Sequence, residues 1–488
     1  MHSDQPRRAF DPSHACAFAL VVLMALATRA IWWGDPVADF DEQLYSFIGW
    51  RMTHGELPYV DWWDRKPFGL FALFGIAHAI GGPGPLAYQV LSFAFALAGA
   101  GFVFLIGRRL ASVWTAAIAA SLSLVLLAAY ASYSGQSEGF FVPLAAAMVW
   151  LLADPHHPSA RRRALLAMLL GGIALQVKYT VLPQCVLLGG WALWQEWRRS
   201  TSIRALVWRA FLFAGAGLLP SVLVGLFYAV GGHWDAFWFA NFVSFFDRMP
   251  APQGRWASEH ALGVAPLAML ALFGIYAAIR FVPPRDRQVY ALVCAWTLSS
   301  LATVLLPGTV YLYYYAAMAA PIALLALPLY DTGGPYRAWP GAALLLALGL
   351  MLSLPERRAE SLEERSVAQA MARDIGPFVG ADKCLWLYDG PAALYRMTGS
   401  CVPTRFVYPD HLNNLLERDA LGVSQSGEVR RVLSTRPAVI VTADRAMTVL
   451  NQDVVAEVRK ELDARYVLAR TYPMHNRNLK VWIRRAGT

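Results

Sequence analysis

Residues 39–67 are DFDEQLYSFIGWRMTHGELPYVDWWDRKP, and they directly follow an apolar run, residues 15–33, that is long enough to cross a bilayer. This stretch carries six carboxylates and ends in a basic pair, Arg65 and Lys66, before Pro67. Charged side chains beside a bilayer are costly to bury and are usually retained for function. We therefore expect the functional site of a membrane protein in this loop.

The composition indicates a chain that crosses the membrane many times. Of its 488 residues, 57% are hydrophobic and only 15% are charged, whereas a soluble domain has about 25% charged residues. The net charge of +9 comes from short basic clusters at the ends of apolar runs, at residues 7–8, 108–109, 161–163 and 198–199. Such clusters mark cytoplasmic loops, so the positive charge indicates topology and not a nucleic-acid partner.

Placing every basic cluster in the cytoplasm predicts about eleven transmembrane helices within residues 1–355. The N-terminus is then cytoplasmic, and residues 33–85 form the first extracytoplasmic loop. Within this loop, residues 68–80 are apolar but too short to span at about 1.5 Å per residue, so we expect a juxtamembrane helix. Residues 164–197 lie between two basic clusters and should form a hairpin of two short helices, with Lys178 near the turn. The last expected spans are residues 310–330 and 339–354.

The chain changes character after residue 355, where apolar runs shorten and charged residues become frequent. The apolar runs of strand length predict strands, with helices between them. This alternation indicates a small α/β domain over residues 356–488, and the odd number of spans places it outside the cytoplasm. The expected strands are residues 384–389, 439–444, 464–472 and 479–485, and the expected helices are residues 391–399, 427–435 and 451–463.

Two of the five cysteines lie in this second domain, which faces an oxidising compartment in the predicted topology. Cys384 and Cys401 open two consecutive expected strands joined by one helix. If those strands are parallel neighbours, their starts are adjacent, and we expect a disulfide between Cys384 and Cys401. Cys16, Cys185 and Cys294 lie in apolar spans, where they are most simply interpreted as small packing residues.

The motifs of the acidic loop occur in an order that resembles a known class. Residues 41–45 (DEQLY) have the pattern D-E-x-x-Y, and residues 64–67 (DRKP) follow after a helix-like run. Together with Glu138, the Lys178 hairpin and residues 311–321 (YLYYYAAMAAP), this order resembles the GT-C class of membrane glycosyltransferases. The likeness is to the branch that holds the protein O-mannosyltransferases, the lipid A aminoarabinose transferases and the Rgt-type galacturonosyltransferases. The tail segment LYDGPAALYRMTG is also similar to periplasmic tails of bacterial members.

This resemblance implies a hexosyl- or pentosyltransferase in the bacterial inner (cytoplasmic) membrane, with the C-terminal domain in the periplasm. The donor would be a sugar linked to polyprenyl phosphate, and the acceptor a glycan, a lipid or a protein. A single displacement would invert the anomeric carbon. The class includes members with and without bound metal, so no cofactor is certain and a divalent metal stays an open option.

The resemblance and the chemistry of such a transfer together nominate the site residues. Asp41 stands where the class has its base, which takes the proton of the acceptor hydroxyl, and Glu42 is the second catalytic candidate. Fixed cations should compensate the departing lipid phosphate. The cationic candidates are Arg65, Lys66 and Lys178, and the other substrate-binding candidates are Tyr45, Asp64, Glu138 and Tyr314.

Simpler structural roles are open for several of these residues. Asp41 and Glu42 could cap the helix that begins near Gln43, whereas Arg65 and Lys66 could be interfacial residues whose charges reach water. For the whole chain, the alternatives are a transporter or flippase for lipid-linked sugars and a non-catalytic binder of them. Transporters tend to show internal repeats and helices broken at the midplane, and the sequence shows neither.

Overall fold

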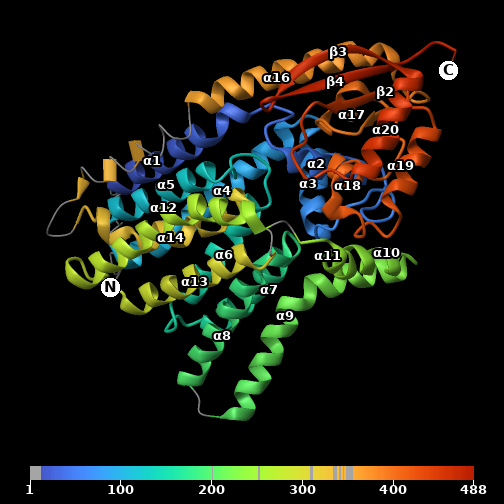
Figure 1. The fold of residues 1–488 in the computed structure, drawn as a ribbon. Helices are drawn as coiled ribbons and strands as arrows, with labels where there is room; N and C mark the ends of the chain where they lie inside the picture. Colours follow the sequence, from blue (N-terminus) through green and yellow to red (C-terminus); the bar gives the residue numbers. More distant parts are fainter. Residues whose placement is uncertain are drawn as a thin grey trace, which may run out of the picture.

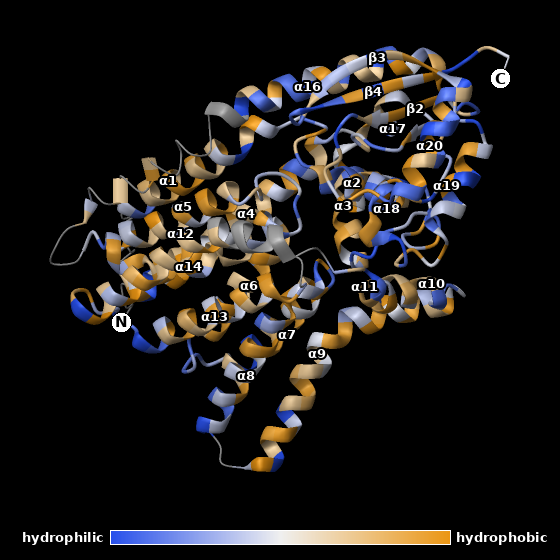
Figure 2. Cartoon of the chain, viewed as in Figure 1, coloured by the Kyte–Doolittle hydropathy of each residue, from blue (hydrophilic) through white to orange (hydrophobic). Residues whose placement is uncertain are grey.

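The computed structural model describes residues 12–199, 202–250, 253–307, 311–333, 338–339, 342–343, 346–347 and 355–487. Figure 1 shows a body of helices, α1 to α14, and a C-terminal part, α16 to β4, that covers one end of this body beside α2 and α3. The helices of the body are largely hydrophobic, whereas α16, α19 and α20 carry many hydrophilic residues (Figure 2). The predicted domain boundary near residue 355 stays a prediction, because residues 348–354 lie outside the described part.

Apolar helices of unequal length build the body. Five are long and apolar enough to cross a membrane: α1 (Pro12–Arg29) with η1 (Ala30–Trp32), α4 (Leu86–Leu110), α9 (Ile203–Val230), Gly263–Arg280 of α12 (Gln253–Arg280), and α13 (Arg287–Leu305). The shorter apolar helices are α3 (Phe68–Gly81), α5 (Val113–Ala129), α6 (Glu138–Leu152), and η4 (Leu312–Met318) followed by α14 (Ala319–Leu325) and η5 (Leu327–Tyr330).

These helices test parts of the predicted topology. The separate short helix expected at residues 68–80 is confirmed by α3, and the predicted hairpin is confirmed by α7 (Ala160–Leu175) and α8 (Leu182–Arg199), with Lys178 between them. The total of eleven spans is not confirmed. The last expected span, residues 339–354, and the basic pair at residues 7–8 lie mostly or wholly outside the described residues.

The acidic loop folds into two closely packed helices, α2 (Phe40–Met52) and α3. At their closest approach, a Cβ atom on Gly49 would lie only 2.5 Å from Phe74 Cβ, so any larger residue would push the helices apart. In the connection between them, Arg51 Nε donates to Glu56 Oε2 at 2.7 Å. The loop is therefore a compact platform and not a solvated linker.

A short aromatic segment after α9 joins this platform to the C-terminal domain. It consists of α10 (Trp234–Trp238), the π-helix η3 (Phe239–Val243) and α11 (Ser244–Asp247). The ring centroids of Phe239 and Trp63 lie 5.5 Å apart, and Ser244 Oγ donates to the Ala420 carbonyl at 2.6 Å. One face of the segment thus packs on the acidic loop and the other on the tail.

The C-terminal domain has a four-stranded sheet in the order β1-β2-β4-β3. Strands β1 and β2 are parallel, whereas β4 is antiparallel to both β2 and β3. The strands are β1 (Leu385–Leu387), β2 (Val439–Ala443), β3 (Tyr466–Met474) and β4 (Arg477–Arg484). The helices are α16 (Pro355–Ile375), α17 (Ala393–Thr398), α18 (Pro409–Asn413), α19 (Gln425–Ser434) and α20 (Gln452–Arg465). The predicted small α/β domain is confirmed.

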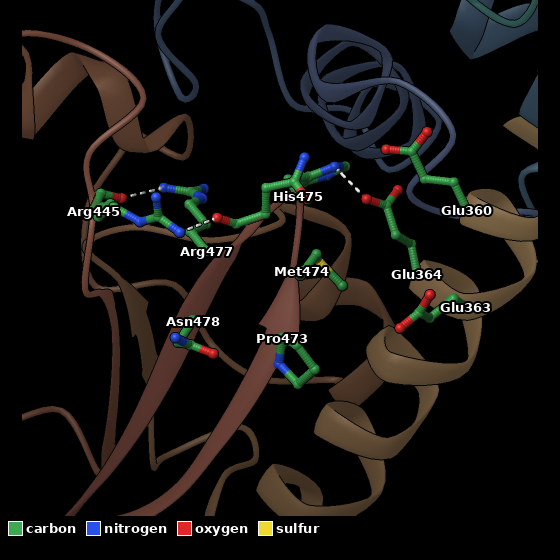
Figure 3. Close-up of a pocket in the computed structure, with 10 residues that line it drawn as sticks. Glu360, Glu363, Glu364, Arg445, Pro473, Met474, His475, Arg477 and Asn478 are labelled. Atoms are coloured by element: carbon green, nitrogen blue, oxygen red, sulfur yellow. Dashed lines mark hydrogen bonds and ion pairs between the residues drawn. The ribbon is translucent and has the colours of Figure 1, made fainter. Parts of the chain in front are cut away.

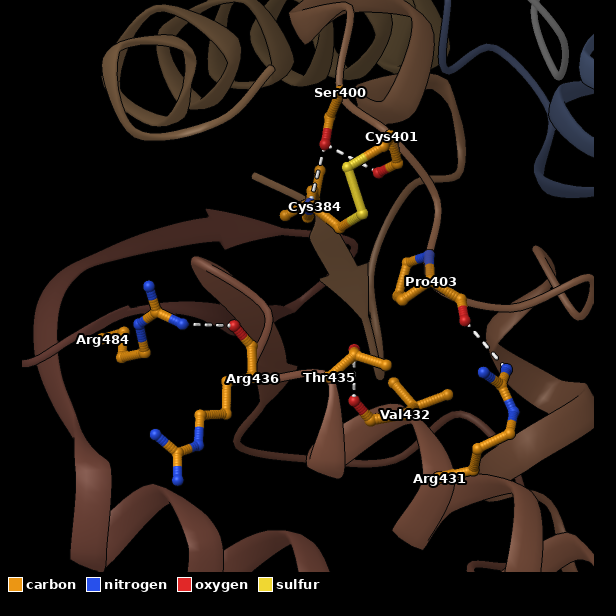
Figure 4. The surroundings of a disulfide bond; sticks show 10 residues. Cys384, Ser400, Cys401, Pro403, Arg431, Val432, Thr435, Arg436 and Arg484 are labelled. Carbon is orange, nitrogen blue, oxygen red and sulfur yellow. Dashed lines mark hydrogen bonds between the residues drawn. A yellow bond between two sulfur atoms is a disulfide. The ribbon is translucent and has the colours of Figure 1, made fainter. Parts of the chain in front are cut away.

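Cys384 and Cys401 form the predicted disulfide, with their Cα atoms 4.6 Å apart (Figure 4). The prediction that a strand begins at Cys401 is wrong, because residues 400–408 contain no strand and β1 pairs with β2. Two other hydrogen bonds hold Cys401 near β1: Ser400 Oγ accepts from Leu385 N at 2.7 Å, and Cys401 N donates to the Gly380 carbonyl at 2.9 Å.

Replacing both cysteines by serine, as C384S/C401S, should lower the free energy of unfolding of the C-terminal domain by about 2–4 kcal/mol, because the bond restricts the unfolded chain. Chemical denaturation measures this change. Thiol titration of the denatured but unreduced wild type should count only Cys16, Cys185 and Cys294. If Cys384 and Cys401 also react, the disulfide does not exist.

Candidate active site

The residue that caps the N-terminus of α2 is Asp39, whereas Asp41 and Glu42 lie in the first turn of the helix. Asp39 Oδ1 accepts from the backbone N–H of Asp41 at 3.0 Å and from that of Glu42 at 3.2 Å. A side-chain oxygen at this position satisfies the free donors of the first helical turn. The capping alternative for Asp41 and Glu42 is therefore wrong, and both carboxylates are available for other partners.

Asp41 is held by groups from two distant segments of the chain. Its Oδ1 accepts from the Tyr408 hydroxyl at 2.9 Å, and its Oδ2 accepts from Gln136 Nε2 at 3.3 Å. Burial raises the pKa of this carboxyl, but the Lys66 ammonium and these two hydrogen bonds outweigh burial and hold the pKa below its ordinary value. Asp41 is thus an oriented carboxylate at neutral pH.

Glu42 lies fully buried on another side of α2. Its Oε1 accepts from the Tyr88 hydroxyl at 3.0 Å, and its Oε2 accepts from the Gly135 N–H. Burial raises the pKa of Glu42 to about 7, although these hydrogen bonds limit the rise. The contacts tie α2 to α4 and to the connection between α5 and α6. They fit a positioning role better than the predicted catalytic one, which stays a prediction.

Lys66 lies on the same side of α2 as Asp41. Its Nζ is 5.6 Å from the centroid of the Tyr45 ring, a cation–π distance, and its carbonyl accepts from the Tyr59 hydroxyl at 2.7 Å. Burial would lower the pKa of Lys66, but the charges of Asp64 and Asp41 raise it above its ordinary value. Within the described residues no carboxylate oxygen lies within 4.0 Å of this ammonium, so it can accept an anionic ligand.

Lys178 and Glu138 form a buried ion pair, as the cost of an unpaired charge at this depth predicts. Ser137 Oγ donates to Glu138 Oε2 at 2.9 Å, and Lys178 Nζ lies 4.0 Å from the centroid of the Tyr314 ring. The charge of Lys178 also helps to lower the pKa of Asp41. The fold therefore brings together six predicted residues: Asp41, Tyr45, Lys66, Glu138, Lys178 and Tyr314.

Arg65 pairs with a carboxylate of the C-terminal domain, and its predicted contact with the donor phosphate stays a prediction. Its Nη1 donates to Oε1 of Glu417 in the C-terminal domain at 3.0 Å, and Arg248 Nε donates to the same carboxylate at 2.6 Å. Burial raises the pKa of Glu417, but the two arginines outweigh it and lower the pKa to about 2. We call this group the Arg65–Glu417–Arg248 lock. The Asp64 carboxylate accepts from the Arg65 backbone N–H, and its charge also acts on Lys66, so Asp64 lies near the cluster around Asp41.

None of the motifs described above includes Tyr408, Asp410 or Gln136. Tyr408 precedes α18, and Asp410 lies in the first turn of this helix. Burial, followed by the charges of Asp389, Glu417 and Asp41, raises the pKa of Asp410 to about 7. Residues 408–411 are YPDH. This group of polar side chains around a proline is the sequence signal that could have indicated that the C-terminal domain contributes to the site.

One group of side chains among the described residues has the spacing of metal ligands. Glu360 and Glu364 of α16 and His475 of the β3–β4 turn have ligand atoms within 4.8 Å of one another (Figure 3). They line a cavity of about 270 Å³ in the C-terminal part, and His475 Nδ1 contacts Glu364 Oε1. This ion pair accounts for the closeness of two of the three groups. The cluster contains none of the predicted site residues, so metal dependence of the Asp41 site is not decided by it.

The chain has the fold of the GT-C-type structures described below, and five of its described helices are long and apolar enough to cross a membrane. Residues 65–223 match the family described as dolichyl-phosphate-mannose-protein mannosyltransferase. The resemblance inferred from the sequence is confirmed, as is the fold class of a helical membrane domain with a C-terminal α/β domain.

Two solved structures are similar over nearly the whole chain. Apo ArnT from Cupriavidus metallidurans is 12% identical with a TM-score of 0.65, and the match covers 96% of this chain and 98% of that one. ArnT from the same organism bound to undecaprenyl phosphate is 15% identical with a TM-score of 0.60, covering 96% and 97%. No curated protein matches the sequence.

Asp410→Asn should make thermal stability less dependent on pH. Because the native pKa of Asp410 is about 7 and the unfolded value is about 3.9, the native state must keep a proton that the unfolded state has released. Stability therefore falls as the pH rises from about 4 to about 7. The variant should have a higher Tm than the wild type at pH 8, and the difference should shrink at pH 5.

The control for this measurement in detergent is Asp419→Asn, which removes a neighbouring exposed carboxylate that pairs with Arg418. Its Tm should follow that of the wild type at both pH values. An Asp410→Asn effect of the same size at pH 5 and pH 8 would show that Asp410 does not titrate in this range.

Proposed function

We propose that this chain transfers a sugar from a polyprenyl-phosphate donor to an acceptor hydroxyl at the outer face of the bacterial cytoplasmic membrane, with inversion. The observation that carries the proposal is the Asp41 carboxylate, ionised, aligned by Tyr408 and Gln136, and beside the ammonium of Lys66. The GT-C-type fold, shared with an ArnT bound to undecaprenyl phosphate, supports this class of donor.

In the proposed step, the acceptor oxygen attacks the anomeric carbon from the face opposite the phosphate. The acceptor proton passes to the Asp41 carboxylate, the bond between the anomeric carbon and the phosphate oxygen breaks, and its electron pair leaves on the polyprenyl phosphate. A carboxylate with a lowered pKa is a weak base. Its contribution therefore depends on fixed orientation and on electrostatic support of the forming positive charge.

The departing phosphate gains charge as the bond breaks, and fixed cations nearby lower the energy of that transition state. Lys66 is the first candidate, because its ammonium has no carboxylate partner within 4.0 Å among the described residues. Lys178 is partly neutralised by Glu138, so its net field is weaker. The rings of Tyr45 and Tyr314 lie against these two ammonium groups and would wall the donor site. Arg65, in contrast, acts through the Arg65–Glu417–Arg248 lock.

The proposal that the Asp41 site lies on the outer face of the membrane rests on the position of a basic cluster relative to the C-terminal domain. The end of α8 that carries Arg198 and Arg199 lies at the end of the helical body away from the C-terminal domain (Figure 1). Basic clusters favour the cytoplasm. The C-terminal domain and the Asp41 site then face the periplasm.

A transporter or flippase for lipid-linked sugars is the alternative. Its binding site would be expected near the bilayer midplane, at broken helices. Asp41 and Lys66 instead lie in the loop platform that the C-terminal domain covers. This position favours a transferase.

Asp41→Asn should abolish transfer while keeping the fold, because asparagine retains the size of the side chain but cannot take the acceptor proton. We expect a loss of about 10²–10⁴-fold in the transfer rate, measured in membranes with a labelled polyprenyl-phosphate sugar. Asp61→Asn is the matched control in the same loop, since Asp61 Oδ2 accepts from Leu57 N at 2.7 Å and is exposed. Wild-type transfer by Asp41→Asn would remove the base assignment.

Lys66→Ala should impair use of the donor more than use of the acceptor, because the ammonium is assigned to the donor phosphate. The donor KM should rise about tenfold or more, which corresponds to the loss of one charge-assisted hydrogen bond. Lys66→Arg keeps the charge and should retain part of the activity. Equal rises in the KM of donor and acceptor would count against the assignment.

A further inference from the structure

A second cavity, of about 430 Å³, lies beside α2 on the side away from Asp41. Its walls come from Gln43, Ser46 and Trp50 of α2, from the connection between α3 and α4 at residues 83–85, and from Arg396 of α17. The three α2 residues recur at helical spacing on one face, and Asp41 and Tyr45 fall on the opposite face at about 100° per residue. The cavity is therefore separate from the Asp41 site.

Arg396 brings a positive charge to this cavity without an acidic partner. Its Nη1 donates to Ser46 Oγ at 2.6 Å, and its guanidinium carbon lies 5.4 Å from the centroid of the Trp50 ring. Across the described ranges, no carboxylate oxygen lies within 4.0 Å of the guanidinium. Burial lowers the pKa of Arg396, and the Tyr88 phenol opposes this effect. Partly buried arginines usually have an anion nearby.

The polar groups around Arg396 orient it but do not neutralise it. His78 Nδ1 lies 2.9 Å from the Gly82 carbonyl, which can only accept, so Nδ1 carries the hydrogen and Nε2 is an acceptor. Ser46 Oγ, 3.0 Å from His78 Nε2, donates to it and accepts from Arg396. This chain of hydrogen bonds is complete and neutral. The charge of Arg396 and its Nη2 and Nε donors therefore remain for a ligand.

The cavity also lies next to a surface that fits lipid. The candidate membrane span α4 begins at Leu86, directly after the cavity wall at residues 83–85. Ile80 at the end of α3 is 84% exposed and Leu86 is 48% exposed. Exposed apolar side chains at the end of a span are expected at the boundary between acyl chains and headgroups.

We propose that this cavity binds the phosphate or carboxylate headgroup of an anionic amphiphile from the surrounding bilayer. Arg396 supplies the charged, fork-shaped donor set, Gln43 and Ser46 supply polar contacts, and Trp50 supplies an apolar wall. Inorganic phosphate offers the same anionic chemistry without an acyl chain. The inference does not rest on the proposed transferase function.

The test measures binding of dodecyl phosphate to the full-length protein in the uncharged detergent dodecyl maltoside. Binding is detected through the ligand-induced shift in Tm. Arg396→Gln should weaken the affinity at least tenfold, and Arg396→Lys, which keeps the charge, should weaken it less. Arg405→Gln is the matched control, because Arg405 lies over another tryptophan, Trp63, outside this cavity, and it should bind like the wild type.

Two results would overturn the proposal. Unchanged affinity of Arg396→Gln would show that the cavity is not the anion site. Competition by inorganic phosphate at the same concentration as dodecyl phosphate would show that no acyl chain is recognised. Because dodecyl phosphate has the same headgroup as the proposed donor lipid, the effect of Arg396→Gln is also measured in the Lys66→Ala background, which removes the cation assigned to the donor phosphate. An affinity that Arg396→Gln still lowers there belongs to this cavity, so failure of the proposed transferase function and failure of this inference are separate outcomes.

Discussion

The pair of hydrogen bonds on the Asp41 carboxylate is the interaction on which the rest of the site depends. Tyr408 and Gln136 come from distant segments of the chain and approach the two oxygens of one side chain. Hydrogen bonds to a charged group contribute about 1.5–3 kcal/mol each, enough to fix one orientation of a short side chain. An ionised carboxylate in a buried site requires such compensation, and the nearby ammonium of Lys66 completes it.

The C-terminal domain is part of the site and not an appendage of the membrane body. Tyr408 reaches Asp41, the Arg65–Glu417–Arg248 lock joins the end of the acidic loop to the same domain, and Ala393 N donates to Gln43 of α2 at 3.1 Å. A carboxylate shared between two arginines resists protonation, because its pKa is lowered to about 2. The docking of the two parts should therefore persist across the physiological pH range.

Much of this arrangement could be predicted from local patterns, because length and charge restrict what a chain in a bilayer can do. The hairpin around Lys178 follows from two basic clusters placed too close for two full spans. The cost of an isolated charge requires Lys178 to be paired or to face a cavity, although it does not select Glu138 as the partner that the structure shows. The strands of the C-terminal domain follow from apolar runs of strand length, and the buried strands β1 and β2 fit such runs.

Partners that lie far apart in the sequence could not be predicted in this way. Tyr408 and Asp41 are 367 residues apart, and the acidic loop shows that Arg65 is charged but not that Glu417 neutralises it. The cysteines illustrate the same limit, since Cys384 and Cys401 are bonded although no strand begins at Cys401.

The central claim is that Asp41 is a base whose pKa is held low by the Lys66 ammonium together with the Tyr408 hydroxyl of the C-terminal domain. It is tested most directly by the pH dependence of kcat/KM in Tyr408→Phe. Loss of the phenol removes a hydrogen bond that favours the ionised carboxylate, so the acidic limb of the profile should move to higher pH while activity at the plateau persists. An acidic limb at the same pH as in the wild type would contradict the account.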